Sequence, residues 1–159
     1  EFGSDHAKMY HPLVNIANTL LHQGKYEEAL NNYNKALTIA ENKWGNDHER
    51  VAYILRKMGE LYERQDGYDK AIDVLNRALA IQKEKHGQDH MKTADTLLII
   101  ANVLNGQGKY EEVMEKYQLV LPIYEKEYGS DHVYVAALLN KIAGTLKNQG
   151  KYKDAMEKY

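Results

Sequence analysis

The sequence contains no cysteine, only two prolines and no long apolar run, and each absence excludes a class of protein. Without cysteine there is no disulfide framework, thiolate metal site or cysteine nucleophile, which favours a reducing, cytoplasmic location. The longest apolar stretch, around Thr96–Leu104, falls far short of the roughly 20 residues that a bilayer-spanning helix needs. No charged segment followed by an apolar one opens the chain, so no secretory signal is expected. Scarce proline favours long helices over a turn-rich β fold.

An excess of charge of either sign is also lacking. Lys and Arg total 21 and Asp and Glu total 23, so the formal net charge at pH 7 is −2. A protein that binds nucleic acid by neutralising phosphates needs a basic excess, and this chain has none. Hydrophobic residues make up 43% and charged residues 28% of the 159 residues, which is typical of a folded globular protein rather than a disordered one.

What the sequence does have is an internal repeat of 42 residues. Columns of Gly, Asp, His, Gln and Tyr recur in strict register along the whole chain, and self-similarity at a fixed period is the signature of a repeat architecture. The five columns contain Gly3, Gly45, Gly87 and Gly129; Asp5, Asp47, Asp89 and Asp131; His6, His48, His90 and His132; Gln23, Gln65, Gln107 and Gln149; and Tyr26, Tyr68, Tyr110 and Tyr152.

Each repeat is predicted to form two antiparallel helices, helix A and then helix B, joined by short turns. In the second repeat, apolar residues over 51–62 follow the 3.6-residue period of a helix, and residues 65–67 then signal a turn. A second apolar stripe runs over 68–81, and Gly87 suits the left-handed residue just past a helix end. Asp89 is expected to cap the next helix with its carboxylate.

One hairpin cannot bury its own apolar faces, so the hairpins are predicted to stack into a right-handed α-solenoid. The predicted fold class is therefore all-α, with about four antiparallel helix-turn-helix repeats in a single array over residues 1–159. The repeats are placed at approximately residues 5–46, 47–88, 89–130 and 131–159, the last of them incomplete.

Columns of small and large apolar residues predict how the helices pack. Small residues in both helices would let a hairpin close tightly, and larger side chains would fill the remaining gaps. Leu97 is expected to be buried, so that Leu97→Ala costs about 2–5 kcal/mol. The small columns contain Ala17, Gly59, Ala101 and Ala143 in helix A and Ala29, Ala71 and Ala155 in helix B, with Val113 the exception. The larger columns contain Leu13, Leu55, Leu97 and Leu139; Ile16, Met58, Ile100 and Ile142; and Tyr33, Leu75 and Tyr117.

These columns resemble the tetratricopeptide repeat (TPR), whose pattern is W-x2-L-G-x2-Y, then A-x3-F, then A. The second repeat matches it with Leu55, Met58, Gly59 and Tyr62, followed by Ala71, Leu75 and Ala78. The 42-residue spacing, the G-x-D-H stretch, the Q-G-K-Y turn and the A-L-x-I ending are similar to those of kinesin light chain repeats. The resemblance covers essentially the whole chain and implies a TPR superhelix, but no single biological role, because this repeat occurs in many unrelated proteins.

The prolines depart from that family's pattern. Kinesin-light-chain-like repeats usually carry proline after the His of D-H, where this chain has Ala7, Glu49, Met91 and Val133. Pro12 instead falls inside the first helix A, which is therefore expected to begin late, near Tyr10 or His11, or to be kinked. Pro122 lies inside the third helix B and is expected to bend it.

The two ends of the chain allow two interpretations. Residues 1–4 resemble a cloning remnant, yet EFGSDH over 1–6 matches EYGSDH over 127–132 at all but one position, which favours native repeat sequence. The chain ends at Tyr159, the equivalent of Tyr117, partway through a helix B. Solenoids normally need polar capping helices at their ends, and none is visible here, so a segment of a longer array is expected.

No metal or phosphate site is predicted. The D-H pairs recur once per repeat and are spread along the array, which is typical of a capping aspartate followed by a surface histidine. His86 and His90 lie on either side of Gly87, not on one helix face, and two ligands are too few for zinc. The G-K turns at 24–25 and 108–109 lack the G-x4-G-K-[ST] frame of a phosphate loop and precede no strand.

Catalysis is not expected either, and no cofactor is implied. The only serines, Ser4 and Ser130, lie in linkers and cannot anchor a convincing Ser-His-Asp triad. The 13 tyrosines could suggest stacking on nucleic-acid bases. Six of them fall in packing columns, however, which favours a role in the core: Tyr26, Tyr33, Tyr68, Tyr110, Tyr117 and Tyr152.

The TPR resemblance implies that helix A lines a concave groove, so the candidate binding residues are those on helix A that packing does not use. Asn side chains could bond a peptide backbone, since an amide both donates and accepts. Arg56 and Arg64 could hold a carboxylate, although Glu60 lies between them and could neutralise them. The groove candidates are Asn18, His22, Tyr53, Arg56, Glu60, Arg64, Asp95, Leu98, Asn102, Asn140 and Lys147.

The same resemblance argues against one known TPR ligand. The clamp with which some TPR domains hold the acidic tail of chaperones uses Lys and Asn at defined groove columns. The matching columns here contain Val14, Asn18, Arg56, Asp95 and Ile99, of which only Asn18 fits outright. Leu98 beside Asp95 suggests a ligand with mixed apolar and polar character.

Two functions of different classes remain. The leading one is a protein-protein interaction scaffold that holds a peptide segment of a partner in the helix A groove without catalysis. The alternative is a structural module that self-associates end to end through exposed terminal repeat faces, giving open stacks rather than closed rings. Neither nucleic acid nor membrane is an expected partner, and an enzyme would need a convergent pocket that the sequence does not show.

Overall fold

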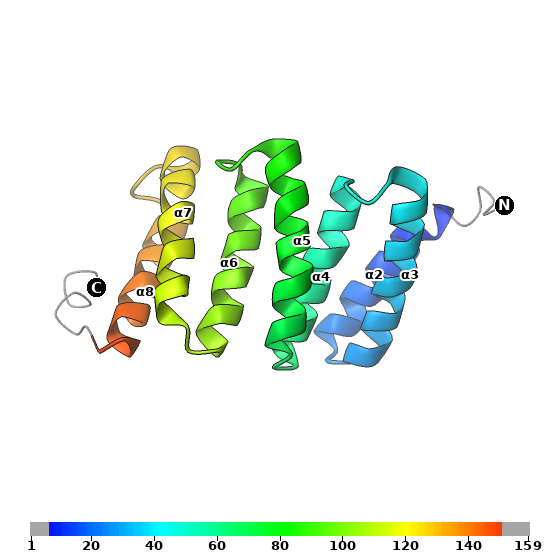
Figure 1. Cartoon of the computed structure of the whole chain (residues 1–159), viewed down its shortest axis with the longest axis horizontal. Helices are drawn as coiled ribbons and strands as arrows, with labels where there is room; N and C mark the ends of the chain where they lie inside the picture. The colour runs from blue at the N-terminus through cyan, green and yellow to red at the C-terminus, as the bar shows by residue number, and fades with distance from the viewer. Residues whose placement is uncertain (1–6, 151–159) are drawn as a thin grey trace. The chain divides into compact units, whose positions relative to one another are not determined.

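A computed structural model describes residues 7–150, and over that range it contains helices and turns but no strand. The predictions made on Gly3, Asp5, His6, Tyr152, Ala155 and Tyr159 lie outside the described residues. The helices are α2 (Tyr10–His22), α3 (Tyr26–Trp44), α4 (Glu49–Arg64), α5 (Tyr68–His86), α6 (Met91–Gly106), α7 (Tyr110–Tyr128) and α8 (Val133–Asn148) (Figure 1).

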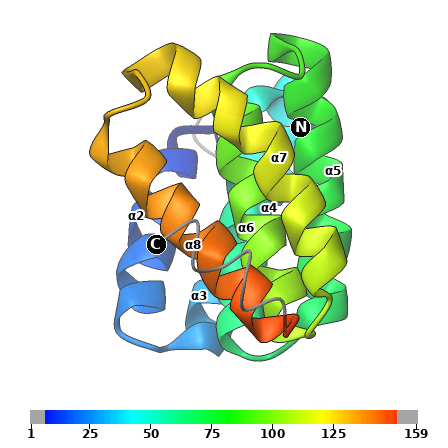
Figure 2. The ribbon, with the colours of Figure 1, turned by 90° about the vertical axis from the view of Figure 1, so that its left-hand side faces the viewer.

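The chain divides into two compact units, unit 1 (Glu1–Lys85) and unit 2 (His86–Tyr159). In unit 1, α2 packs on α3, and α4 packs on both of them. In unit 2, α6 packs on α7 and α7 packs on α8. Figure 2 shows α7 and α8 side by side as an antiparallel hairpin. The prediction of antiparallel helix pairs is confirmed.

The small-residue columns lie where the paired helices touch. Ala17 and Ala29 are fully buried in unit 1, and Ala101 and Ala143 are fully buried in unit 2. At Gly59 the approach is closest, because a Cβ added there would lie 2.5 Å from Cγ of Leu75. The predicted use of small residues at the helix contacts is confirmed.

Most of the larger predicted core residues are buried as well, but Leu13, Ile16 and Leu139 are not. Tyr33 and Leu75 are fully buried, and Leu97 is 3% exposed. Ile16, however, is 48% exposed although its register equivalents are buried. Val14, placed on the groove by sequence reasoning, is buried instead. α2 packs only on helices that follow it in the described structure, so the burial pattern of the other helix A segments does not transfer to it.

The two prolines have different consequences. α2 begins at Tyr10, which confirms the late start and places Pro12 in the first turn, where a missing N–H costs nothing. α7 continues as an α-helix through Pro122, whose ring is exposed. The bend expected at Pro122 stays a prediction.

The helix N-termini are capped by a different residue from the one expected. The prediction that Asp89 caps α6 is wrong, because the cap is His90, whose Nδ1 accepts the Lys92 N–H at 3.1 Å. His48 caps α4 and His132 caps α8 in the same way. For the aspartate to be the cap, each of these helices would have to begin at the histidine. Each begins one residue later, so the extended residue before the first turn is the histidine.

The turn that ends the helix B segments follows the prediction. Gly87 has φ +90°, in the left-handed region that glycine adopts without strain. At the other turn of the second repeat, Asp66 takes a positive φ of 56° where other repeats have glycine. Its Oδ1 accepts a hydrogen bond from the Tyr68 hydroxyl at 2.8 Å.

No helix among the described residues is long and apolar enough to cross a membrane.

Candidate functional site

Three of the predicted groove residues meet in unit 1, across α2 and α4. The Asn18 Nδ2 donates to the Tyr53 hydroxyl at 3.3 Å. The Arg56 guanidinium carbon lies 5.9 Å from the centroid of the Tyr53 ring, within the range of a cation–π contact. Asn18, Tyr53 and Arg56 are partly buried, so they form a connected polar surface rather than isolated solvated side chains.

A buried tyrosine, Tyr33, which the sequence analysis assigned to the core, contacts this surface through a hydrogen bond. Tyr33 on α3 is fully buried, and its hydroxyl donates to the Asn18 Oδ1 at 2.6 Å. Burial raises the pKa of Tyr33, and the nearby Tyr53 and Glu60 raise it further. The phenol therefore stays protonated and keeps donating, which fixes the orientation of the Asn18 amide.

Glu60 has a cationic partner that the sequence analysis did not consider. Its carboxylate binds the Lys57 ammonium at 2.9 Å, within α4. The two side chains are about one-quarter exposed, so solvent screens the pair only in part. Arg64 and His22, the remaining candidates of unit 1, are exposed.

In unit 2 the predicted residues are less connected. Asn102 on α6 accepts a hydrogen bond from the Lys141 ammonium on α8, with 3.4 Å between Oδ1 and Nζ. Asp95 and Leu98 are partly buried on α6, whereas Asn140 and Lys147 on α8 are exposed. Lys141 was not among the predicted residues, although it joins the helix A segments of two successive repeats.

Sequence reasoning also missed a column of rings at the turns from helix B to helix A. The Trp44, His86 and Tyr128 positions are 42 residues apart, and each ring stacks on the capping histidine four residues later. The ring centroids of His86 and His90 are 4.6 Å apart. The two histidines therefore meet across Gly87, although they lie on different helices. No group of three metal-ligating side chains occurs in the part of the chain that the structure describes.

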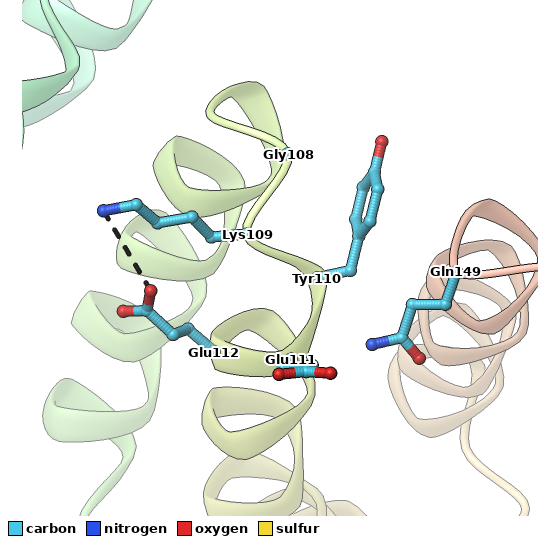
Figure 3. A pocket seen from close by; sticks show the side chains of 6 residues that line it. All are labelled: Gly108, Lys109, Tyr110, Glu111, Glu112 and Gln149. Carbon is cyan, nitrogen blue, oxygen red and sulfur yellow. Dashed lines mark ion pairs between the residues drawn. The ribbon is translucent and has the colours of Figure 1, made fainter.

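An open pocket of about 390 Å³ lies at the turn between α6 and α7 (Figure 3). Its lining comes from Gly108 and Lys109 of the turn, from the first residues of α7 up to Glu112, and from Gln149 after α8, whose amide Figure 3 shows pointing towards Glu111. Lys109 and Glu112 form an exposed ion pair at 4.0 Å across one side. A pair of that kind contributes only about 0–1 kcal/mol, and none of the predicted groove residues lines this pocket.

Comparison with known families decides the classification. The sequence profile described as "Tetratricopeptide repeat" matches residues 5–84, 50–126 and 92–159, which together cover nearly the whole chain. The chain belongs to the tetratricopeptide repeat family. No curated protein matches it in sequence.

Solved TPR structures show the same fold. The crystal structure of "Podosopora anserina putative kinesin light chain nearly identical TPR-like repeats" has a TM-score of 0.84 at 17% identity, covering 98% of this chain and 74% of that one. BtubC (BKLC) from P. vanneervenii has a TM-score of 0.83 at 20% identity, covering 96% and 60%. The resemblance to TPR repeats of the kinesin light chain type is confirmed, and the fold is an all-α TPR solenoid.

A third structure is a Rap protein complexed with Competence and Sporulation Factor. Its TM-score is 0.78 at 17% identity, covering 99% of this chain but 42% of the Rap protein. At such identities the likeness shows the fold alone. TPR repeats occur in proteins of different activities, so function has to be argued from the surface of this chain.

Proposed function

We propose that this chain is a non-catalytic protein-interaction scaffold that binds a peptide segment of a partner protein along its helix A residues. Residues 1–159 would act as one TPR array in a cytoplasmic protein, with neither nucleic acid nor membrane as partner. The observation that carries the proposal is the Asn18–Tyr53–Arg56 surface, in which side chains from two successive helix A segments touch.

The chemistry of this surface suits an extended peptide. The Asn18 amide is oriented by Tyr33 before any ligand arrives, so little side-chain entropy is lost on binding. Arg56 adds a positive charge and Tyr53 an aromatic face. In unit 2, Asn102 supplies a second amide and Leu98 an apolar contact, which together favour a ligand of mixed polarity.

A solved structure of the same fold offers a precedent for a bound partner. The Rap protein structure contains Competence and Sporulation Factor as its complexed partner. That precedent belongs to the Rap protein, and it supports the proposal only through the shared fold.

Selected peptides and a double surface variant test the proposal. Peptides would be selected from a phage-displayed library on the wild-type chain, and their affinities then measured for Arg56→Ala combined with Asn102→Ala. We expect binding to weaken about tenfold or more, because a lost charged or hydrogen-bonding partner typically costs about 1–3 kcal/mol. Asn18 is avoided, because removing it would leave the buried Tyr33 hydroxyl without its acceptor.

Arg77→Ala is the matched control for charge. Arg77 lies on α5, a helix B, where it pairs with Glu41 at 2.7 Å. Its removal changes the net charge as Arg56→Ala does, but away from the helix A residues. Equal affinity of the wild type and the double variant, or equal weakening by the control, would remove the groove from the proposal.

Self-association is the second candidate, and the exposure of α2 favours it. Ile16 is 48% exposed and Met9 is 49% exposed, whereas the register equivalents of Ile16 are buried. Another repeat stacked on α2 would bury Ile16, as Met58, Ile100 and Ile142 are buried in their own helices.

Light scattering over a concentration series distinguishes this candidate from the first. End-to-end contact predicts a molar mass that rises with concentration, and Ile16→Lys should abolish that rise. Thr38→Lys, at an exposed position on α3, is the control and should leave it intact. A constant monomer mass for the wild type would exclude self-association while leaving peptide binding untouched.

A further inference from the structure

Four rings gather at the turn between α7 and α8 in unit 2. Tyr128 is their centre: its ring stacks on His132 at 4.8 Å and makes edge contacts with Tyr124 at 5.6 Å and with Tyr134 at 5.0 Å between centroids. His132 and Tyr134 are themselves 4.9 Å apart. We call Tyr124, Tyr128, His132 and Tyr134 the tyrosine cluster.

The tyrosine cluster is open to solvent. Tyr134 is 52% exposed and Tyr128 is 37% exposed, and the adjoining Val133 is 67% exposed. The α7–α8 turn lies at the opposite end of these helices from the α6–α7 turn and its pocket (Figure 1). Exposed aromatic rings in one patch are a common mark of an interaction surface.

The equivalent turn in unit 1 shows what such rings hold. Trp44 and His48 occupy the register positions of Tyr128 and His132, and Arg50 occupies that of Tyr134. The guanidinium carbon of Arg50 lies 4.1 Å from the Trp44 ring centroid and 5.4 Å from that of Tyr10. At this turn of unit 1, therefore, the chain supplies its own cation to the ring faces.

At the α7–α8 turn the cation is replaced by a further ring, and the segment that carries the cluster has a negative net charge. Within residues 124–134, three exposed carboxylates, Glu125, Glu127 and Asp131, accompany one lysine, Lys126. Burial and the charge of Asp95 raise the pKa of Tyr124 to about 12, so its phenol stays neutral at physiological pH. Carboxylates beside electron-rich ring faces favour a cation and repel an anion.

We propose that the tyrosine cluster binds an arginine side chain of a partner protein. Arginine is favoured over lysine because its planar guanidinium stacks on aromatic faces, as Arg50 does in unit 1. The cluster shares no residue with the Asn18–Tyr53–Arg56 surface, so the proposal goes beyond the proposed groove and does not depend on it.

Nuclear magnetic resonance with a defined probe tests the proposal on the whole chain. The probe is acetyl-Gly-Gly-Arg-Gly-Gly-amide, titrated against the ¹⁵N-labelled protein. We expect chemical-shift changes concentrated at Tyr124, Tyr128, His132 and Tyr134. A second titration uses the same peptide with citrulline in place of arginine, which keeps the shape and removes the charge, and it should give no such changes.

Variants at one position make the test specific. Tyr134→Arg restores the unit 1 arrangement and should fill the cluster from within, so that the probe binds about five- to tenfold more weakly. Tyr134→Phe keeps the ring and should bind as the wild type does. Asn148→Arg adds the same charge at the exposed far end of α8 and should change binding little.

Three results would overturn the proposal. The first is an equal response to the citrulline peptide, and the second is unchanged binding by Tyr134→Arg. The third is a shift of the cluster signals with protein concentration in the absence of probe, which would assign the surface to a second copy of this chain. Circular dichroism melts check that each variant is folded. The result of this test does not depend on the result of the groove test.

Discussion

The imidazole of His90 makes two contacts at once. Its Nδ1 accepts the Lys92 N–H at 3.1 Å, and its ring face stacks on His86. The first contact satisfies one of the free N–H groups at the start of α6, and the second ties α6 to the end of the preceding helix. His48 and His132 repeat both contacts at their own turns.

Substitution of His90 separates the cap from the stack. His90→Ala removes both contacts and should lower the free energy of unfolding by about 0.5–2 kcal/mol, the usual cost of losing a helix cap. His90→Asn keeps an acceptor at the position of Nδ1 and should recover most of that loss. Urea denaturation of the three proteins gives the comparison, and equal stability of the two variants would assign the whole effect to stacking.

Tyr124 predicts an alkaline limit to stability. Burial, Asp95 and two neighbouring tyrosines raise its pKa from 10.0 to about 12, so the folded state favours the neutral phenol. Its contribution is therefore fully present below pH 10 and is lost as the pH rises from about 10 to 12. In thermal melts over that range, Tyr124→Phe should lose less stability than the wild type. Parallel curves for the two proteins would contradict this assignment.

Helix pairs are the next scale, and Gly59 sets the closest approach among them. The backbone of α4 comes so near α5 that a Cβ at Gly59 would overlap Leu75, which is itself fully buried. A glycine inside a helix costs about 0.5–1 kcal/mol relative to alanine. The close contact with Leu75 is the packing gain that offsets this cost.

A double-mutant cycle tests that explanation. Gly59→Ala alone should destabilise the protein by about 1–2 kcal/mol, because overpacking exceeds the gain in helix propensity. In a Leu75→Ala background, which is itself less stable by about 2–5 kcal/mol, the same change should be stabilising. Chemical denaturation of the four proteins measures the sign, and a loss in both backgrounds would contradict the overlap.

Element positions follow largely from the sequence, whereas their ends do not. The apolar period and the turn residues predicted the helix pairs. Pro12 predicted either a late start near Tyr10 or His11 or a kink, and α2 begins at Tyr10. The choice between Asp89 and His90 as cap depended on a shift of one residue, which periodicity does not resolve. The exposure of Ile16 depends on whether another element packs against that face of α2. The sequence of α2 carries no information on that.

At the scale of the whole molecule, repeat proteins are stabilised mainly by contacts within and between neighbouring repeats. Leu97 in unit 2 and Leu55 in unit 1 occupy the same column and are 3% and 2% exposed. The two positions therefore form a matched pair for asking whether a defect stays local.

Leu97→Ala should cost about 2–5 kcal/mol, as should Leu55→Ala. Hydrogen exchange should show that Leu97→Ala lowers amide protection most in α6 and α7, and Leu55→Ala most in α4 and α5. Uniform loss over residues 7–150 in either variant would mean that the chain unfolds as one cooperative body.

The candidate surface was predictable only as a set of positions. Sequence reasoning placed Asn18, Tyr53 and Arg56 on helix A faces, but their contacts depend on distances between helices that no local pattern specifies. Tyr33 shows what a sequence column can and cannot predict. Its column predicted burial correctly but gave no sign that its hydroxyl would donate a hydrogen bond to Asn18. The tyrosine cluster was missed because its rings come from two helices and a turn.

The histidine caps have a practical consequence for anyone who follows this protein in solution. Because Nδ1 accepts a backbone bond in His48, His90 and His132, the ring proton of each folded turn resides on Nε2. Release of a turn frees both nitrogens to exchange that proton. Long-range ¹H–¹⁵N spectra of three imidazoles thus provide built-in reporters, one for each junction, that reveal the order in which the array comes apart.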